Sequence, residues 1–133
     1  RAGSRAMRIS AAEAQKYFEH PSQQLGGLDP KDLPDAGFHY FSSDLICGVF
    51  HLVSDPGIFM SHYGAIPEGW GSLASPAVSI LYEAWSELDA QRFIGWTEMN
   101  NKAALAFAKR LGFVIDGGMP LKDKVMVMQG WTP

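Results

Sequence analysis

The stretch that most constrains the fold is residues 92–113, RFIGWTEMNNKAALAFAKRLGF. Residues 93–97 form a short apolar run rich in aromatic and β-branched side chains, which predicts a buried strand. Either Asn100 or Asn101 can cap a helix that follows, and Gly112 is a typical residue for its end. The apolar face of this helix repeats at helical spacing and comprises Ala104, Phe107, Ala108 and Leu111. The stretch therefore predicts a strand, a capped helix and a further apolar segment in close succession.

The helix and the residues after it carry the pattern N-x-x-A-x-x-F-A-x-x-L-G-F over residues 101–113. This pattern resembles the last conserved block of the GNAT N-acyltransferase superfamily, whose members transfer an acyl group from acyl-coenzyme A to an amine. The resemblance implies an acetyl-coenzyme A-dependent N-acyltransferase whose acceptor is a small-molecule or peptide amine. It also implies that Asn101 and Phe107 contact the coenzyme arm, although a role as helix cap explains Asn101 equally well.

The composition is that of one globular domain. Apolar residues make up 47% of the 133 residues and charged residues 19%, which excludes an intrinsically disordered chain. The net charge is -3 and the 11 basic residues are scattered, which argues against nucleic-acid binding, and no apolar run is long enough to span a membrane. Cys47 is the one cysteine, so we expect no internal disulfide and a reducing compartment, the cytoplasm. We expect a single GNAT-like domain over residues 7–133, with residues 1–6 a remnant of cloning that precedes a candidate initiator at Met7.

The N-terminal half predicts a short strand, one helix and three more strands. Ser10 and Glu13 have the spacing of a capping box, which predicts a helix over residues 11–19. Residues 22–37 are rich in Gly, Pro, Asp and Gln and predict a loop with at most one helical turn, so the sequence defines little of an acceptor pocket. Turn sequences separate the strand candidates, which lie at residues 7–10, 38–41, 45–53 and 58–66. The last three of these predict an antiparallel meander.

A crossover helix is predicted before the stretch at residues 92–113. Ser75 is a suitable cap, and Pro76 fits the first position of a helix over residues 76–88. Its predicted buried face comprises Ala77, Ile80, Leu81, Ala84, Trp85 and Leu88. Because this helix connects two strands of one sheet, those two strands should run parallel.

The end of the chain completes the sheet. We expect a strand at residues 114–115, a turn at residues 117–118 and a last strand over residues 125–131. The residues alone indicate an α/β or α+β domain with a mixed sheet. The GNAT resemblance implies an α+β fold in the order β-α-β-β-β-α-β-α-β-β, with a mixed, mostly antiparallel sheet flanked by helices. An apolar last strand ending in Trp131 offers an edge that would pair across a homodimer.

A loop before the crossover helix matches the GNAT coenzyme-binding loop in part. Members of that superfamily hold the coenzyme pyrophosphate on backbone N–H groups at a helix start, in a loop written Q/R-x-x-G-x-G/A. Here residues 66–71, IPEGWG, match that loop, with Ile66 in place of the Arg or Gln. The resemblance implies that the pyrophosphate contacts Gly69, Trp70, Gly71 and Ser72. It implies further that Ala65 and Ile66 pair with the pantetheine arm, and a plain turn is the alternative interpretation of the loop.

Acylation of an amine needs a proton acceptor, because an alkyl-ammonium group has a pKa of about 10. Glu98 is the first candidate, since it follows the strand at residues 93–97, at the end where GNAT members hold the thioester. His62 is the second, and Glu68 is a third. Each also has a structural interpretation, Glu98 at the helix dipole, His62 within a strand and Glu68 as a solvated loop charge. The histidines His39, His51 and His62 fall on successive predicted strands, but they lack the spacing of a metal site, and we expect no metal.

The proton donor that GNAT members often use is missing. They place a tyrosine five residues before the Phe of Gly-Phe, where it protonates the departing thiolate, and Ala108 occupies that position here. Some branches, including the ribosomal-protein acetyltransferases, also lack this tyrosine.

Direct acyl transfer to an amine is therefore the first functional prediction. The alternative is a GNAT-fold binding or structural protein without catalytic activity, of the kind found in tailed phages. We interpret Tyr63, Trp70 and Trp96 as core or pocket wall.

Overall fold

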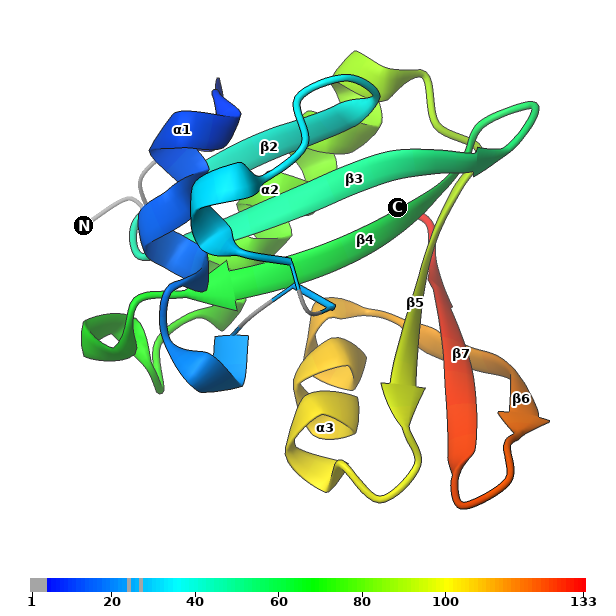
Figure 1. The fold of residues 1–133 in the computed structure, drawn as a ribbon. Helices are drawn as coiled ribbons and strands as arrows, with labels where there is room; N and C mark the ends of the chain where they lie inside the picture. Colours follow the sequence, from blue (N-terminus) through cyan, green and yellow to red (C-terminus); the bar gives the residue numbers. More distant parts are fainter. Residues whose placement is uncertain (1–4, 24, 27) are drawn as a thin grey trace.

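The computed structural model describes residues 5–23, 25–26 and 28–133. Within these residues, the strands form one sheet in the order β1-β2-β3-β4-β5-β7-β6 (Figure 1). Their bounds are β1 Met7–Ile9, β2 Phe38–Ser43, β3 Ile46–Ser54, β4 Ile58–Ala65, β5 Arg92–Glu98, β6 Val114–Pro120 and β7 Val125–Trp131. Neighbouring strands are antiparallel except β4 and β5, which are parallel. The predicted α+β class and mixed, mostly antiparallel sheet are confirmed.

Helices cover both faces of the sheet. They are α1 Ala11–Ala14, α2 Ala74–Leu88 and α3 Lys102–Leu111, with 3-10 turns at η1 Gln15–Phe18, η2 Pro21–Gln23, η3 Pro30–Asp32 and η4 Pro67–Gly69. α1 and α2 lie on opposite faces (Figure 1). The order of strands and α-helices is the predicted one. In the described part of the chain, no helix has both the length and the apolar character needed to cross a membrane.

Alternation of side chains along the central strands gives each face its own core. On the α2 face, the rings of Phe50, Phe93 and Trp131 pack in series, with centroids 4.7 and 5.7 Å apart. On the α1 face, Phe18 packs with Val49, and both are fully buried. A fully buried side chain of this kind contributes roughly 1.5–3 kcal/mol relative to exposure. The predicted face of α2 is confirmed, since four of its members are buried and two pack at the margin of the core: Ala77, Ile80, Leu81, Ala84, and then Trp85 and Leu88.

Two predictions near helices need correction. α2 begins at Ala74, two residues earlier than predicted, and its N-cap is Leu73 rather than Ser75. Pro76 fits inside the first turn because N–H groups there have no intrahelical partner to lose. The loop over residues 22–37 holds more than the single helical turn expected, because η2 extends into its start and η3 lies within it.

The predicted capping box is confirmed at the start of α1. The Ser10 side chain accepts from the Glu13 N–H, and the Glu13 carboxylate accepts from the Ser10 N–H. The helix that it begins changes from α to 3-10 geometry at Gln15, and Phe18 ends this turn fully buried. The last turn therefore tightens where it places an aromatic ring against the sheet.

The C-terminal hairpin also differs from the prediction. Residues 117–118 lie inside β6 and pair with β7, so they form no turn. The chain reverses at residues 121–124, where the Leu121 N–H donates to the Lys124 carbonyl at 2.7 Å. β7 is paired on both sides, by β5 and β6. Its edges are therefore occupied, and the strand predicted to pair across a homodimer is not free to do so; the edge strand at this end of the sheet is β6.

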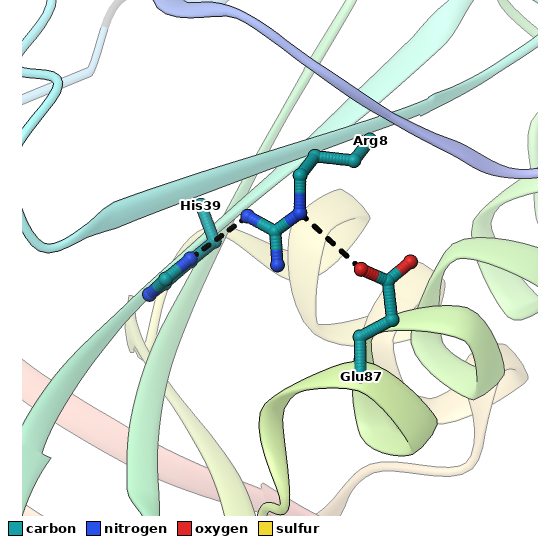
Figure 2. Close-up of polar contacts among 3 residues, drawn as sticks. All are labelled: Arg8, His39 and Glu87. Atoms are coloured by element: carbon teal, nitrogen blue, oxygen red, sulfur yellow. Dashed lines mark hydrogen bonds and ion pairs between the residues drawn. The ribbon is translucent and has the colours of Figure 1, made fainter.

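Arg8 fixes β1 to the sheet and to α2. Its guanidinium donates to Nδ1 of His39 at 2.9 Å and to the Glu87 carboxylate at 3.2 Å (Figure 2). Burial, and then the nearby guanidinium, lowers the pKa of His39, so its ring stays neutral and accepts this bond.

Ala6, predicted to belong to a cloning remnant, is buried in the core on the α2 face.

Candidate active site

The sheet opens into a fork between β4 and β5. The two strands pair from Ile58 with Arg92 to Met60 with Ile94, and they then diverge toward their carboxyl ends (Figure 1). Ser61 lies at the apex, where its hydroxyl donates to the Ile94 carbonyl at 3.3 Å. Beyond the apex, β4 has a ladder partner on its β3 side only. Backbone groups on the other side therefore have no partner in the sheet and must pair with a side chain or a ligand.

A cavity of about 630 Å³ fills this fork. β4 and β5 form two of its walls, and α3 closes a third. The apolar face predicted for α3 lines it with all four members: Ala104, Phe107, Ala108 and Leu111. Among the described residues of the wall there is no Asp, Glu, Lys or Arg. The cavity thus suits a ligand whose buried part is uncharged, and polar groups inside it act in a low dielectric.

His62 is the candidate base that lies in the cavity wall. Burial, and then repulsion from His51, lowers its pKa to about 4. The imidazole is therefore neutral near pH 7 and has a lone pair that can accept a proton. His51 is its neighbour on β3, whereas His39 lies apart and binds Arg8. In the described part of the chain, no three potential metal ligands come together.

Glu98 and Glu68 do not line the cavity. The Glu98 side chain is 46% exposed, and its carboxylate lies 3.8 Å from Nζ of Lys124. The three residues before it do line the cavity: Gly95, Trp96 and Thr97. β5 therefore leaves the cavity wall at its last residue, Glu98. Of the three candidate bases, the fold thus places the second-ranked His62 in the cavity wall and leaves Glu98 and Glu68 outside it.

Tyr63 carries a buried hydroxyl with no hydrogen-bond partner in the described structure. Burial raises the pKa of this phenol well above its usual range. The nearby Ser61 hydroxyl opposes the rise, yet it donates its own proton to Ile94. The Tyr63 ring lines the cavity and packs edge-on against Phe50. An unpaired buried hydroxyl costs roughly 1–3 kcal/mol, so it marks a place where a ligand would supply the partner.

The backbone groups predicted to meet the pantetheine arm are already bonded. The Ile66 N–H donates to the Leu45 carbonyl at 2.9 Å, and Ile66 does not line the cavity. The Ala65 N–H points away from β3 and donates to Oε1 of Gln23 at 3.0 Å. Gln23 belongs to η2 and forms part of the cavity wall. A ligand that uses the Ala65 N–H must therefore displace the Gln23 side chain.

The predicted pyrophosphate loop uses most of its own N–H groups. The Gly69, Trp70 and Ser72 N–H groups donate to carbonyls within the loop, at 2.9 to 3.1 Å. Gly71 has a φ of +98°, which favours glycine. The first intrahelical bond of α2 runs from Ala77 to Leu73, so the N–H groups of the first turn before it point outward without intrahelical partners. In the described structure, N–H groups without a backbone acceptor therefore remain at Gly71 and in the first turn of α2.

The remaining predicted contacts lie around α3. Asn101 is its N-cap, with its side chain accepting from the Ala104 N–H at 3.2 Å, and it also lines the cavity. Phe107 and Trp70 line the cavity as well, and Trp70 is 48% exposed. Both proposed roles of Asn101 are thus compatible with its position.

Two residues of the site received no chemical role from the sequence. Gln23 lies in a loop whose composition predicts no structure, so no local pattern marks it. Tyr63 was interpreted as core or pocket wall, and the wall position is correct. Strand alternation would have revealed one useful relation: neighbours on β4, such as His62 and Tyr63, must point to opposite faces of the sheet.

No family model matches the sequence, and no curated protein matches it either. Solved structures, however, share the arrangement of strands and helices. An acetyltransferase of the GNAT family from Bacillus anthracis matches with a TM-score of 0.69 and 12% identity, over 97% of this chain and 95% of that chain. The chain has the GNAT fold.

Two further structures with the GNAT fold hold a coenzyme. Aminoglycoside acetyltransferase AAC(6')-Ib in complex with coenzyme A matches with a TM-score of 0.73 and 11% identity, over 96% of this chain and 94% of that chain. The protein yncA, a putative acetyltransferase from Salmonella typhimurium with its cofactor acetyl-CoA, matches with a TM-score of 0.69 and 13% identity, over 98% of this chain and 94% of that chain. At such identities, the likeness establishes the fold.

Proposed function

We propose that this protein is an acyl-coenzyme A-dependent N-acyltransferase that moves an acetyl group from acetyl-coenzyme A to an amine. The observation that carries the proposal is the cavity in the β4–β5 fork, which combines a neutral imidazole at His62 with an unpaired donor at Tyr63. Solved structures with the same fold hold coenzyme A or acetyl-CoA. The resemblance of residues 101–113 to the last GNAT block supports the same reading independently.

The residues around the cavity fit an acyl-coenzyme A donor. Backbone N–H groups in the first turn of α2 offer an anion site for the pyrophosphate, strengthened by the helix dipole. The Ala65 N–H faces the fork and would meet the arm once Gln23 moves away. Asn101 and Phe107 on the α3 side complete the wall. The apolar lining suits the acyl group and its thioester, neither of which is charged.

Acyl transfer forms a bond from the amine nitrogen to the acyl carbon and breaks the carbon–sulfur bond. The nitrogen loses one proton, and the sulfur takes an electron pair and then a proton. His62 would accept the proton from nitrogen, since its ring is neutral and lies in the wall. Glu98 is the weaker candidate, because its carboxylate faces Lys124 outside the cavity.

The sulfur needs a proton donor in place of the tyrosine that Ala108 replaces. Tyr63 is the phenol in the described wall of the cavity, and its hydroxyl has no partner. Because Tyr63 follows His62 on β4, the two side chains point to opposite faces of the sheet. The strand would thus present a proton acceptor on one side of the thioester and a proton donor on the other.

The acceptor is proposed to be a small molecule or a peptide with one reactive amine. AAC(6')-Ib structures include complexes with aminoglycosides, which carry several cationic groups. The cavity here has no carboxylate among the described residues of its wall, so it offers no ion pair to such a ligand. An amine that enters the cavity in its neutral form is a better match to this wall than a ligand with several cationic groups.

Thermal unfolding with acetyl-coenzyme A tests the proposal. A ligand that binds only the folded state at a hundredfold excess over its dissociation constant adds about 2.7 kcal/mol of stability. We expect a rise in melting temperature with acetyl-coenzyme A, competition by coenzyme A, and release of free thiol when an amine panel is added. An unchanged melting temperature up to millimolar acetyl-coenzyme A, with no heat in calorimetry, would exclude the proposal.

A binding or structural protein without catalytic activity is the second candidate. The engaged N–H groups favour it, since Gln23 holds Ala65 and the loop holds the predicted pyrophosphate donors internally. Ile66 in place of the Arg or Gln points the same way. Coenzyme binding without any thiol release across the amine panel would support this candidate over the enzyme.

A further inference from the structure

We propose that His51 takes on the proton that His62 accepts, so that the two imidazoles work as one proton relay from the cavity toward solvent. This inference rests on the proposed function for the source of the proton. The residues themselves are a pair on adjacent antiparallel strands, His51 on β3 and His62 on β4, in a register that places Val49 opposite His62 and His51 opposite Met60.

The rings meet through their nitrogen edges. Nε2 of His51 and Nε2 of His62 lie 3.4 Å apart, the ring planes are parallel to within 4°, and the centroids are 5.5 Å apart. Because the nitrogens are much closer than the centroids, the edges rather than the ring faces are in contact. One Nε2–H can therefore point at the lone pair of the other Nε2, which is the geometry of a shared proton.

The two ends of the pair differ in exposure. His62 lines the cavity and is the more deeply buried ring, so a positive charge left on it would be costly. His51 is less buried, and burial is what lowers its pKa. Among the described groups, burial and the partner ring are the influences on the pKa of His62. A proton therefore gains solvation by moving from His62 to His51.

β2 packs against the histidine pair and keeps the His51 ring aligned. On β2, Phe38 stacks on the His51 ring with centroids 4.7 Å apart and planes 22° apart. Phe38 and His51 are also paired residues of the ladder. His39 belongs to the same strand as Phe38, but alternation turns it to the opposite face, where it binds Arg8. The β2 side thus supplies an apolar brace rather than a second titrating group.

The transfer balances in protons. The amine proton adds to the free nitrogen of His62, Nδ1, for which the described structure gives no protein partner. The proton on Nε2 of His62 passes to Nε2 of His51, and Nδ1 of His51 releases one proton to water. No electrons move between residues, and exchange with water restores the two tautomers between turnovers. The sulfur side is unaffected, since its proton comes from a separate donor.

Histidine titration by NMR tests the relay without requiring turnover. In the wild-type protein we expect the His62 ring signals to titrate in two coupled steps, because protonating one ring disfavours protonating the other. In His51→Gln, a single step at a higher pKa is expected. His39→Gln is the matched control, a strand histidine on the other face, and it should leave the His62 titration unchanged. Identical His62 titration in wild type and His51→Gln would overturn the proposal.

Kinetics then separate this inference from the proposed function. If acetyl transfer occurs, His51→Gln should lower kcat about tenfold with an unchanged KM for acetyl-coenzyme A and a shifted acid limb of the pH profile, and it should add no loss in the His62→Gln background. Full kcat in His51→Gln would overturn the relay while leaving the enzyme intact. A coupled titration without any thiol release would instead remove the proposed function and, with it, the relay as a path for the amine proton.

A second measurement covers the case in which His51→Gln does not fold. Wild-type protein with ¹⁵N-labelled histidine reports the state of both Nε2 atoms directly. We expect one protonated and one unprotonated Nε2 near pH 7, with a coupling across the hydrogen bond between them. Two protonated or two unprotonated Nε2 atoms would overturn the relay.

Discussion

Oε1 of Gln23 accepts the Ala65 N–H at 3.0 Å, at the point where the β4–β5 fork is open. The residues are 42 positions apart in the sequence. The contact places a side-chain carbonyl where the fork offers a backbone donor to a ligand, so the free protein satisfies this N–H by itself. Under the proposed function, the Gln23 side chain must move before the coenzyme arm can pair with Ala65.

Replacing Gln23 with alanine should therefore destabilise the ligand-free protein and strengthen its binding of coenzyme A. We expect Gln23→Ala to lower the free energy of unfolding without ligand by about 1 kcal/mol, since the Ala65 N–H loses its partner. Coenzyme A should then bind about fivefold more tightly, because no competitor remains. Calorimetry and chemical denaturation measure both quantities. Gln23→Glu keeps an acceptor and serves as the control, with no gain in affinity; weaker binding by Gln23→Ala would mean that Gln23 contacts the coenzyme instead.

The depressed pKa of His62 predicts a loss of stability in acid. In the unfolded chain His62 titrates near its ordinary value of 6.5, and in the folded protein near 4. Between these pH values the unfolded state binds more protons than the folded state. The contribution of His62 to the free energy of unfolding is therefore complete above pH 6.5 and is lost as the pH falls toward 4. The loss amounts to roughly 3 kcal/mol at most. His51 and His39 act in the same direction.

Urea denaturation between pH 4 and 7 measures this effect. His62→Gln should flatten the acid limb, because glutamine does not titrate and still offers a hydrogen-bonding group to His51. His20→Gln is the control, since His20 is exposed and contacts Trp70 rather than the histidine pair. An acid limb as steep in His62→Gln as in wild type would show that other groups cause it.

The two candidate bases are expected to differ strongly in a kinetic comparison. His62→Gln should reduce turnover by roughly 10²-fold or more at saturating substrates, the loss typical of a general base. Glu98→Gln should change turnover by less than about threefold, since it removes only an exposed ion pair with Lys124. Steady-state kinetics with acetyl-coenzyme A and an accepted amine give the answer. The reverse order of losses would place the base at the end of β5.

Removing the Tyr63 hydroxyl should stabilise the ligand-free protein. We expect Tyr63→Phe to raise the free energy of unfolding by roughly 1 kcal/mol, because it removes an unpaired buried polar group and keeps the ring. Tyr40→Phe is the matched control, since the Tyr40 hydroxyl donates to the Pro34 carbonyl, and its loss should destabilise by a similar amount. Destabilisation by Tyr63→Phe would reveal a partner for this hydroxyl inside the protein.

Local chemistry determined the elements of this fold. The capping box at Ser10 and Glu13, the cap at Asn101 and the left-handed Gly112 all have the predicted roles, because each depends on neighbours within a few residues. Apolar spacing likewise identified the buried face of α2. Ends were less accurate, as at Ala74, because tertiary packing can extend a helix past a suitable cap.

Tertiary structure decided the candidate site. Sequence alone ranked Glu98 before His62, since Glu98 lies at the carboxyl end of its strand, but only the divergence of β4 from β5 shows which side chain reaches the cavity. The contact of Gln23 with Ala65 and the pairing of His51 with His62 join segments from different strands and loops. Such contacts depend on strand register and on burial, which no local pattern encodes. The unpaired state of the Tyr63 hydroxyl is of the same kind, because it is a property of everything packed around it.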